Sequence, residues 1–149
     1  KTLLRQIENI NPSLIGIGFK SSHLQLAKDL TARIKERFNA PVVWGGDHPT
    51  IAPETCIEHT DIVCVGEGFD ALLELAGNII NGRPYDKINN LWINKNGSII
   101  RNPSRPLLND LDVLPFASYT PENKIYIDEG KVQKDKNIDY FVLRLNTEK

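Results

Sequence analysis

The sequence contains no methionine and only two cysteines, Cys56 and Cys64, in 149 residues. Both lie in apolar contexts and are too few for a disulfide framework or a zinc site, so we expect reduced, packed thiols. No apolar run approaches the roughly 18 residues of a membrane-spanning helix. The polar start is not a signal peptide, which predicts a cytoplasmic protein without a membrane partner. The missing initiator methionine predicts that this chain is a piece of a longer protein.

A strong excess of charge of either sign is also missing. Eighteen basic and 19 acidic side chains leave a formal net charge of −1. Because a protein that holds a nucleic-acid backbone needs a basic surface, we expect no nucleic-acid partner. With 40% hydrophobic and 25% charged residues, the composition is that of an ordinary globular domain. The length fits one core with an appended segment.

The first half of the chain alternates between strand and helix patterns. We expect strands over 14–19, 41–44 and 62–65, and helices over 3–10, 24–38, 52–59 and from 69 to about 80. Because the turns from strand to helix are short, the pattern predicts an α/β fold with an open parallel sheet flanked by helices. In the last helix, we expect these apolar residues to face the core: Leu72, Leu75, Ala76, Ile79 and Ile80.

The pattern changes after residue 83. Asn96-Gly97 between two apolar runs predicts an appended β-hairpin at the sheet edge. The prolines that follow exclude a long helix or a central strand, so residues 107–116 are expected to form an extended strap. A second hairpin is expected around Glu129-Gly130, and one more strand over 138–145. We therefore divide the chain into an α/β domain with its hairpin (1–101), a strap and linker (102–137) and a final segment (138–149).

Glycine-rich turns follow two of the predicted strands, at Gly45-Gly46 and at Gly66-Glu67-Gly68. The carboxyl ends of parallel strands share one edge of a sheet, where open α/β sheets bind ligands. Glycine allows a positive φ and lets a ligand approach the backbone closely. The predicted site therefore lies on these turns. The alternative, that they are only tight connections between strand and helix, stays open.

The polar side chains near these turns each have two interpretations. His48 either contacts a ligand or holds its own loop. Glu67 either acts on a ligand or caps a helix start, where free N–H groups stabilise a carboxylate. Ser21, Ser22 and Thr50 either donate to a phosphate or ribose or serve as helix caps. We predict no catalytic residue and no metal ligand, because neither cysteine has an identifiable base beside it.

Several separate motifs occur in a familiar order. They are Gly45-Gly46-x-His48-Pro49-Thr50 with Pro53-Glu54, Asp61-x-Val63-x-x-Gly66-Glu67-Gly68, Asn102-Pro103-x-Arg105, and Leu111-Asp112-x-Leu114-Pro115. Over roughly residues 5–118 the chain resembles the N-terminal cobalamin (B12)-binding-type domain of B12-dependent radical S-adenosylmethionine enzymes. The resemblance implies a Rossmann-like, flavodoxin-type sheet whose strand ends face the corrin ring or its nucleotide tail.

The resemblance also implies which residues bind and what the rest of the enzyme supplies. The implied cofactor-binding residues are Ser21, Ser22, Gly45, Gly46, His48, Pro49, Thr50, Gly66, Glu67 and Gly68. A catalytic barrel should begin near Ile138, but its Cys-x-x-x-Cys-x-x-Cys loop is absent from this sequence. The 4Fe-4S cluster and S-adenosylmethionine would therefore belong to a C-terminal part outside this chain, which is not catalytic alone. In methylating members, methylcobalamin gives a methyl group to a substrate radical made in the barrel.

One cobalamin motif is missing. The Asp-x-His-x-x-Gly signature that supplies an axial histidine is absent, since Asp47 and His48 are adjacent. We therefore expect cobalamin without a lower histidine ligand. The first hypothesis is a cofactor-binding domain of an enzyme for methyl transfer or for oxidative cyclisation or rearrangement. The second is a corrin-free α/β module that docks on the barrel or gates its substrate. A flavodoxin-like receiver is set aside, because the turns offer only Asp47.

Overall fold

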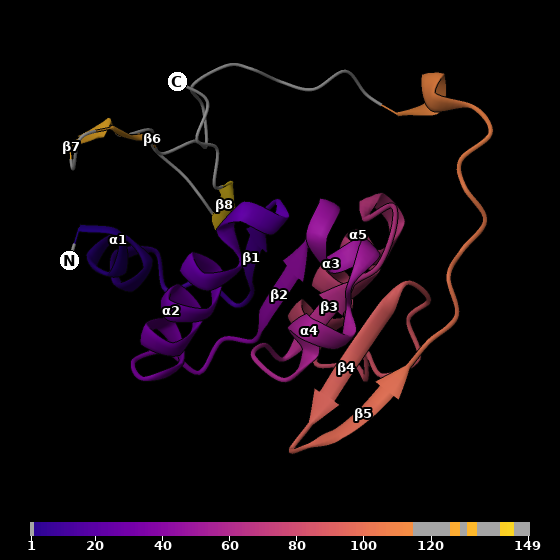
Figure 1. The fold of residues 1–149 in the computed structure, drawn as a ribbon, viewed down its shortest axis with the longest axis horizontal. Helices are drawn as coiled ribbons and strands as arrows, with labels where there is room; N and C mark the ends of the chain where they lie inside the picture. The colour runs from indigo at the N-terminus through magenta and orange to yellow at the C-terminus, as the bar shows by residue number, and fades with distance from the viewer. Residues whose placement is uncertain (1, 115–125, 129–130, 134–140, 145–149) are drawn as a thin grey trace.

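A six-stranded sheet forms the centre of the fold, in the order β5-β4-β3-β2-β1-β8 (Figure 1). The computed structural model describes residues 2–114, 126–128, 131–133 and 141–144. The strands are β1 (Ile15–Gly18), β2 (Val42–Gly45), β3 (Ile62–Cys64), β4 (Leu91–Lys95), β5 (Ser98–Arg101) and β8 (Phe141–Arg144). Strands β8, β1, β2 and β3 run parallel to one another, whereas β4 pairs antiparallel with β3 and β5 pairs antiparallel with β4. The predicted open parallel sheet with an edge hairpin is confirmed.

Helices cover both faces of this sheet. They are α1 (Thr2–Ile10), α2 (Leu24–Lys35), α3 (Asp47–Ile51), α4 (Glu54–Ile57) and α5 (Phe69–Ile80), with a 3-10 turn η1 (Ser21–His23) before α2. Side chains of α1, α2 and α4 share one buried cluster with the sheet, and α5 contributes to a second cluster. Successive strand residues point to opposite faces, which is why Trp44 belongs to the first cluster and Val43 to the second. No helix within the described ranges is long and apolar enough to cross a membrane.

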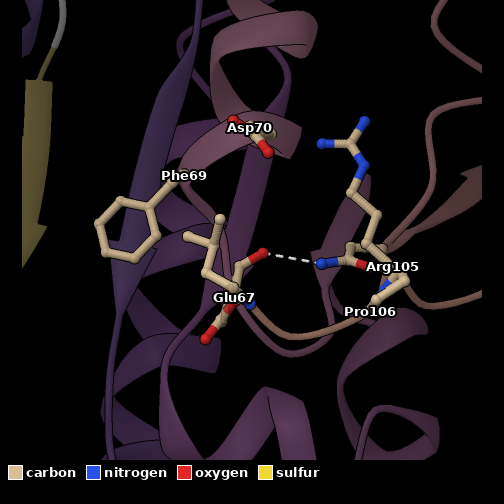
Figure 2. A pocket seen from close by; sticks show the side chains of 7 residues that line it. Glu67, Phe69, Asp70, Arg105 and Pro106 are labelled. Atoms are coloured by element: carbon tan, nitrogen blue, oxygen red, sulfur yellow. Dashed lines mark hydrogen bonds between the residues drawn. The ribbon is translucent and has the colours of Figure 1, made fainter. Parts of the chain in front are cut away.

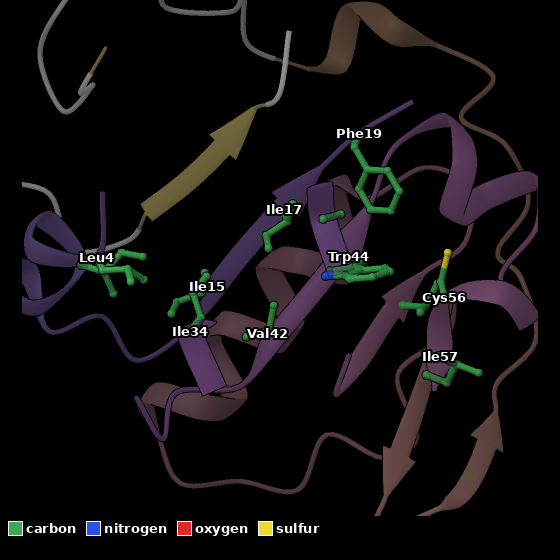
Figure 3. Packing of buried hydrophobic residues seen from close by; sticks show 12 residues of the cluster. Leu4, Ile15, Ile17, Phe19, Ile34, Val42, Trp44, Cys56 and Ile57 are labelled. Atoms are coloured by element: carbon green, nitrogen blue, oxygen red, sulfur yellow. The ribbon is translucent and has the colours of Figure 1, made fainter. Parts of the chain in front are cut away.

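Trp44 is the largest side chain of the first cluster and is fully buried. Its indole Nε1–H donates to the Thr31 hydroxyl on α2 at 2.8 Å, so the one polar atom of the ring is satisfied. Phe19 packs edge-on against the indole, with ring centroids 5.0 Å apart (Figure 3). The tryptophan therefore links α2 to the segment that leaves the carboxyl end of β1.

The predicted inward face of α5 is partly wrong. Ala71 and Leu75 are buried, but Leu72 is 40% exposed and Ile80 is 77% exposed. An α-helix turns by about 100° per residue, so positions nine apart, such as Ala71 and Ile80, lie on opposite sides. Apolar residues occur on more than one side of this helix, and their spacing alone did not identify the side that meets the sheet.

The helical segment after β2 also differs from the prediction. The helix expected over 52–59 is the short α4, and the separate helix α3 begins earlier, at Asp47. Gly46 has a φ of 101° and turns the chain directly from β2 into α3. Pro49 lies in the first turn of this helix, where a missing N–H costs nothing. Pro49 is therefore compatible with a helix that begins at Asp47.

The hairpins and the strap lie beyond α5. Asn96 and Gly97 have φ values of 52° and 90°, as the tight β4–β5 turn requires, which confirms the first hairpin. After β5 the strap is described from residue 102 to 114 and contains the 3-10 turn η2 (Leu111–Val113); the end of the predicted strap 107–116, at residues 115 and 116, lies outside the described residues. Strands β6 (Tyr126–Asp128) and β7 (Lys131–Gln133) pair as the second predicted hairpin. Strand β8 lies within the predicted strand 138–145 and pairs with β1; the predicted division into three domains stays a prediction.

Candidate functional site

Three turns meet at the carboxyl edge of the parallel strands. They follow β1 at Gly18–Ser21, β2 at Gly45–Gly46 and β3 at Gly66–Gly68. Gly18 and Gly45 are direct neighbours across β1 and β2. The structure therefore brings together the glycine turns that the sequence indicated, because parallel strands end at the same edge of their sheet.

Gly46 allows the turn after β2 to pack closely against the turn after β1. A Cβ at this position would lie only 2.9 Å from the Phe19 carbonyl oxygen and 3.0 Å from the Phe19 nitrogen. The Phe19 N–H donates to the Gly45 carbonyl at 3.1 Å, and the His48 N–H donates to the Phe19 carbonyl at 3.4 Å. The absent side chain is thus what permits the two backbones to approach each other.

His48 is only 9% exposed and holds two other segments together. Its ring Nδ1 lies 2.9 Å from the Ser21 hydroxyl, and its Nε2 lies 3.0 Å from the Thr55 hydroxyl. Because Thr55 donates its proton to the Ala52 carbonyl at 2.8 Å, the Nε2–H of the ring is the donor to the Thr55 hydroxyl. A ligand contact through either nitrogen would have to replace one of these bonds.

Replacing His48 with alanine is therefore expected to destabilise the protein by about 1–3 kcal/mol, since two hydroxyls lose a partner and a buried ring is removed. Urea unfolding measures this change. His59→Ala is the matched control, because His59 is exposed and stacks on Trp44 outside the turns. Equal stability losses in the two variants would contradict the bridging role of His48.

The other hydroxyl residues are placed differently from the predicted helix caps. The residues before η1 and α2 are Lys20 and His23, and neither makes a side-chain cap, so the predicted capping by Ser21 or Ser22 is wrong. Ser22 instead lies 3.1 Å from Nδ1 of His23. Thr50 donates to the Gly46 carbonyl at 2.8 Å and accepts from the Gly66 N–H at 3.1 Å. Thr50 therefore joins the turn after β2 to the turn after β3.

Glu67 binds the strap and does not cap α5. The residue before α5 is Gly68, and no side chain caps that helix. The Glu67 carboxylate accepts from the Leu108 N–H at 3.0 Å, and its carbonyl accepts from the Asn90 side chain at 2.7 Å. The strap is also held by an ion pair from Arg105 to Glu74 on α5.

A pocket of about 200 Å³ lies between the start of α5 and the strap (Figure 2). It is lined by Glu67, Phe69, Asp70, Asn90, Arg105, Pro106 and Leu108. Nη1 of Arg105 is buried and has no hydrogen-bond partner among the described residues. Sequence reasoning missed the contributions of Asn90 and Thr55. The Asn89-Asn90 pair before a strand was a usable signal for Asn90, because asparagine tolerates the positive φ of 71° found there.

Small residues form a row across the strands on the side that faces α5. Gly18 pairs with Gly45, and a Cβ on Gly45 would meet only the Cys64 Cβ, at 3.8 Å. A Cβ on Gly18 would meet only the Gly45 carbonyl oxygen, at 3.9 Å. Burial raises the pKa of the Cys64 thiol to about 11, so it stays protonated at neutral pH. This row offers bare backbone with room above it, which suits a large ligand laid against the strand ends.

The chain matches a known family over its first half. Residues 1–76 match the family described as the B12 binding domain. The chain belongs to this B12-binding domain family. A relative from Pyrococcus horikoshii, "Uncharacterized methyltransferase PH0819", is 32% identical over 118 aligned residues. The alignment covers 76% of this chain and 26% of the relative.

The fold of this chain also occurs in solved structures of larger enzymes. The radical S-adenosylmethionine methyltransferase TsrM from Kitasatospora setae, with tryptophan substrate and a SAM analogue bound, matches with a TM-score of 0.61 and 25% identity over 68% of this chain and 21% of that one. The cobalamin-dependent S-adenosylmethionine radical enzyme OxsB, with aqua-cobalamin and S-adenosylmethionine bound, matches with a TM-score of 0.61 and 18% identity, over 70% and 16%. The B12-binding chain thus spans about a quarter of its curated relative and about a fifth of these enzymes.

Proposed function

We propose that this chain binds cobalamin at the carboxyl edge of β1, β2 and β3. The observation that carries the proposal is the pair Gly18 and Gly45, which leaves bare backbone at the place where open α/β sheets bind ligands. Membership of the B12-binding domain family supports the choice of ligand. The predicted residues Gly46, His48 and Thr50 would hold the three turns in place around it.

Cobalamin should bind without a histidine on its cobalt. The sequence contains three histidines. Both ring nitrogens of His48 bond to Ser21 and Thr55, and Nδ1 of His23 lies beside Ser22. His59 follows α4 and precedes β3, so it lies at the opposite end of the strands from the glycine turns. These contacts support cobalamin binding without a histidine ligand on the cobalt.

The whole protein is proposed to be a radical S-adenosylmethionine enzyme that transfers a methyl group. The names of the Pyrococcus relative and of TsrM support methyl transfer over the oxidative chemistry that the motifs also allow. When bound, cobalamin supplies the cobalt chemistry of methyl transfer, while residues of this chain bind and orient it. The 4Fe-4S cluster, S-adenosylmethionine and the substrate would bind to parts of the enzyme outside residues 1–149. The cytoplasmic location stays a prediction.

A titration of the protein with hydroxocobalamin, followed by its absorbance, tests this proposal. We expect saturable binding that is lost in Gly45→Leu, because a Cβ there makes only an ordinary contact with the Cys64 Cβ at 3.8 Å and the rest of the side chain would occupy the proposed ligand space. A bulky residue at Gly46 would be a poor probe, because it collides with Phe19. The matched control is Gly77→Leu on α5, where a Cβ meets nothing within 4 Å.

The outcomes separate the two hypotheses of function. Binding that survives Gly45→Leu would place cobalamin elsewhere and overturn the proposed site. The absence of any binding to the unaltered protein would favour the corrin-free docking module. Loss of binding in Gly77→Leu, with the fold retained, would show that the assay reports general perturbation of α5.

A further inference from the structure

Asn90 lies at the start of β4, next to the carboxyl end of its antiparallel neighbour β3. Its side chain is almost fully buried and uses both ends of the amide. The amide Nδ2–H donates to the Glu67 carbonyl at 2.7 Å, and the Oδ1 accepts from the Arg105 N–H at 2.5 Å. One side chain therefore holds both the turn after β3 and the strap.

The backbone of Asn90 adds two more links between the same segments. Its N–H donates to the Pro103 carbonyl at 2.9 Å, and its carbonyl accepts from the Val65 N–H at 2.8 Å. The φ of 71° is a conformation that few residues other than glycine and asparagine adopt readily. Four hydrogen bonds thus converge on one residue whose side chain is needed for two of them.

We propose that Asn90 is a positioning residue for the candidate cobalamin site. By holding the Glu67 carbonyl, it sets the turn 66–68, whose Gly66 N–H donates to Thr50, and by holding Arg105 it places the strap as one wall of the pocket beside this turn. The Glu67 carboxylate completes the wall by accepting from Leu108. The effect on binding rests on the proposed function, whereas the placement of the strap does not.

The matched pair Asn90→Asp and Asn94→Asp tests this role in hydroxocobalamin binding. Aspartate at position 90 keeps an acceptor for Arg105 but loses the donor to the Glu67 carbonyl. Asn94 has the same two-bond pattern further along β4, where it donates to the Ile57 carbonyl at 3.0 Å and accepts from the Gly97 N–H at 2.8 Å. Each substitution removes one donor from a part-buried hydrogen bond to a backbone carbonyl, so comparable losses of thermal stability are expected.

We expect Asn90→Asp to weaken binding about tenfold, which corresponds to about 1.4 kcal/mol, and to change the absorbance spectrum of the bound corrin. Asn94→Asp should stay within about twofold of the unaltered protein, since a 0.4 kcal/mol change is that small. Unchanged affinity in Asn90→Asp would overturn the proposal. The proposal would also be overturned if both variants lost affinity in proportion to their loss of thermal stability.

Amide hydrogen exchange separates this inference from the proposed function. In the unaltered protein without ligand, the Arg105 and Leu108 N–H groups should be protected, and Asn90→Gly should expose Arg105 while keeping the positive φ. Unprotected amides in the unaltered protein would overturn the positioning role. Protected amides together with no hydroxocobalamin binding would overturn the proposed function alone.

Discussion

Gly46→Ala is expected to destabilise the protein by about 3 kcal/mol and to abolish hydroxocobalamin binding. Two costs combine at this position. The φ of 101° is strained for any residue with a side chain, and the new Cβ would lie 2.9 Å from a backbone oxygen of Phe19. Backbone atoms cannot move aside as a flexible side chain can, so the turns after β1 and β2 must separate. Urea unfolding measures the stability, and the titration measures binding.

Gly77→Ala is the control for this prediction. Gly77 lies inside α5, where a Cβ would meet nothing within 4 Å and the backbone is helical. Alanine there should stabilise the protein by about 0.5–1 kcal/mol, because glycine loses more conformational freedom on folding. If the two variants changed stability by the same amount and in the same direction, the close approach at Gly46 would not matter.

Trp44→Ala should destabilise the protein by about 3–5 kcal/mol, the range found when a large buried aromatic is removed. The indole is fully buried, and the Thr31 hydroxyl would lose its hydrogen bond from the indole N–H. Phe19 would also lose its edge contact, and Phe19 supplies the carbonyl that receives the His48 N–H. The stability loss should therefore come with weaker hydroxocobalamin binding, measured on the fraction that remains folded.

Trp92→Ala provides the comparison for Trp44. Trp92 is only partly buried on β4, and Arg101 lies over its ring with the guanidinium carbon 5.0 Å from the centroid. A loss of about 1–2 kcal/mol is expected there, since a partly exposed ring has less apolar area to return to water. A larger loss for Trp92 than for Trp44 would contradict the assignment of Trp44 to the centre of the core.

Much of the fold could be predicted because its signals are local. Short apolar runs such as 62–65 bounded by turn residues identified β3, and Asn96-Gly97 identified the hairpin. Predictions failed where two faces of one helix carried similar residues. Leu72 and Ile80 are as apolar as Leu75, and only packing against the sheet shows that Leu75 is the buried one.

The candidate site was predictable in position but not in its bonding. Gly45, Gly46 and the turn 66–68 lie where the strand pattern placed them. The partners of His48 are Ser21, 27 residues away, and Thr55, seven residues away. The position of Glu67 near the start of α5 suggests a helix cap, yet its carboxylate accepts a hydrogen bond from the Leu108 N–H of the strap. Such partners depend on how the elements pack, which no local pattern records.

The class of sheet and the edge that carries the glycine turns could be predicted from strand and helix periods and from glycine, whose backbone freedom is a property of the residue alone. The resemblance to cobalamin-binding domains rests on the four sequence motifs and their order. That His48 bridges Ser21 and Thr55, and that Asn90 holds the strap, is seen only in the folded chain. A hydrogen bond requires two groups to meet within about 3 Å, and for groups far apart in the chain that meeting is set by strand register and packing.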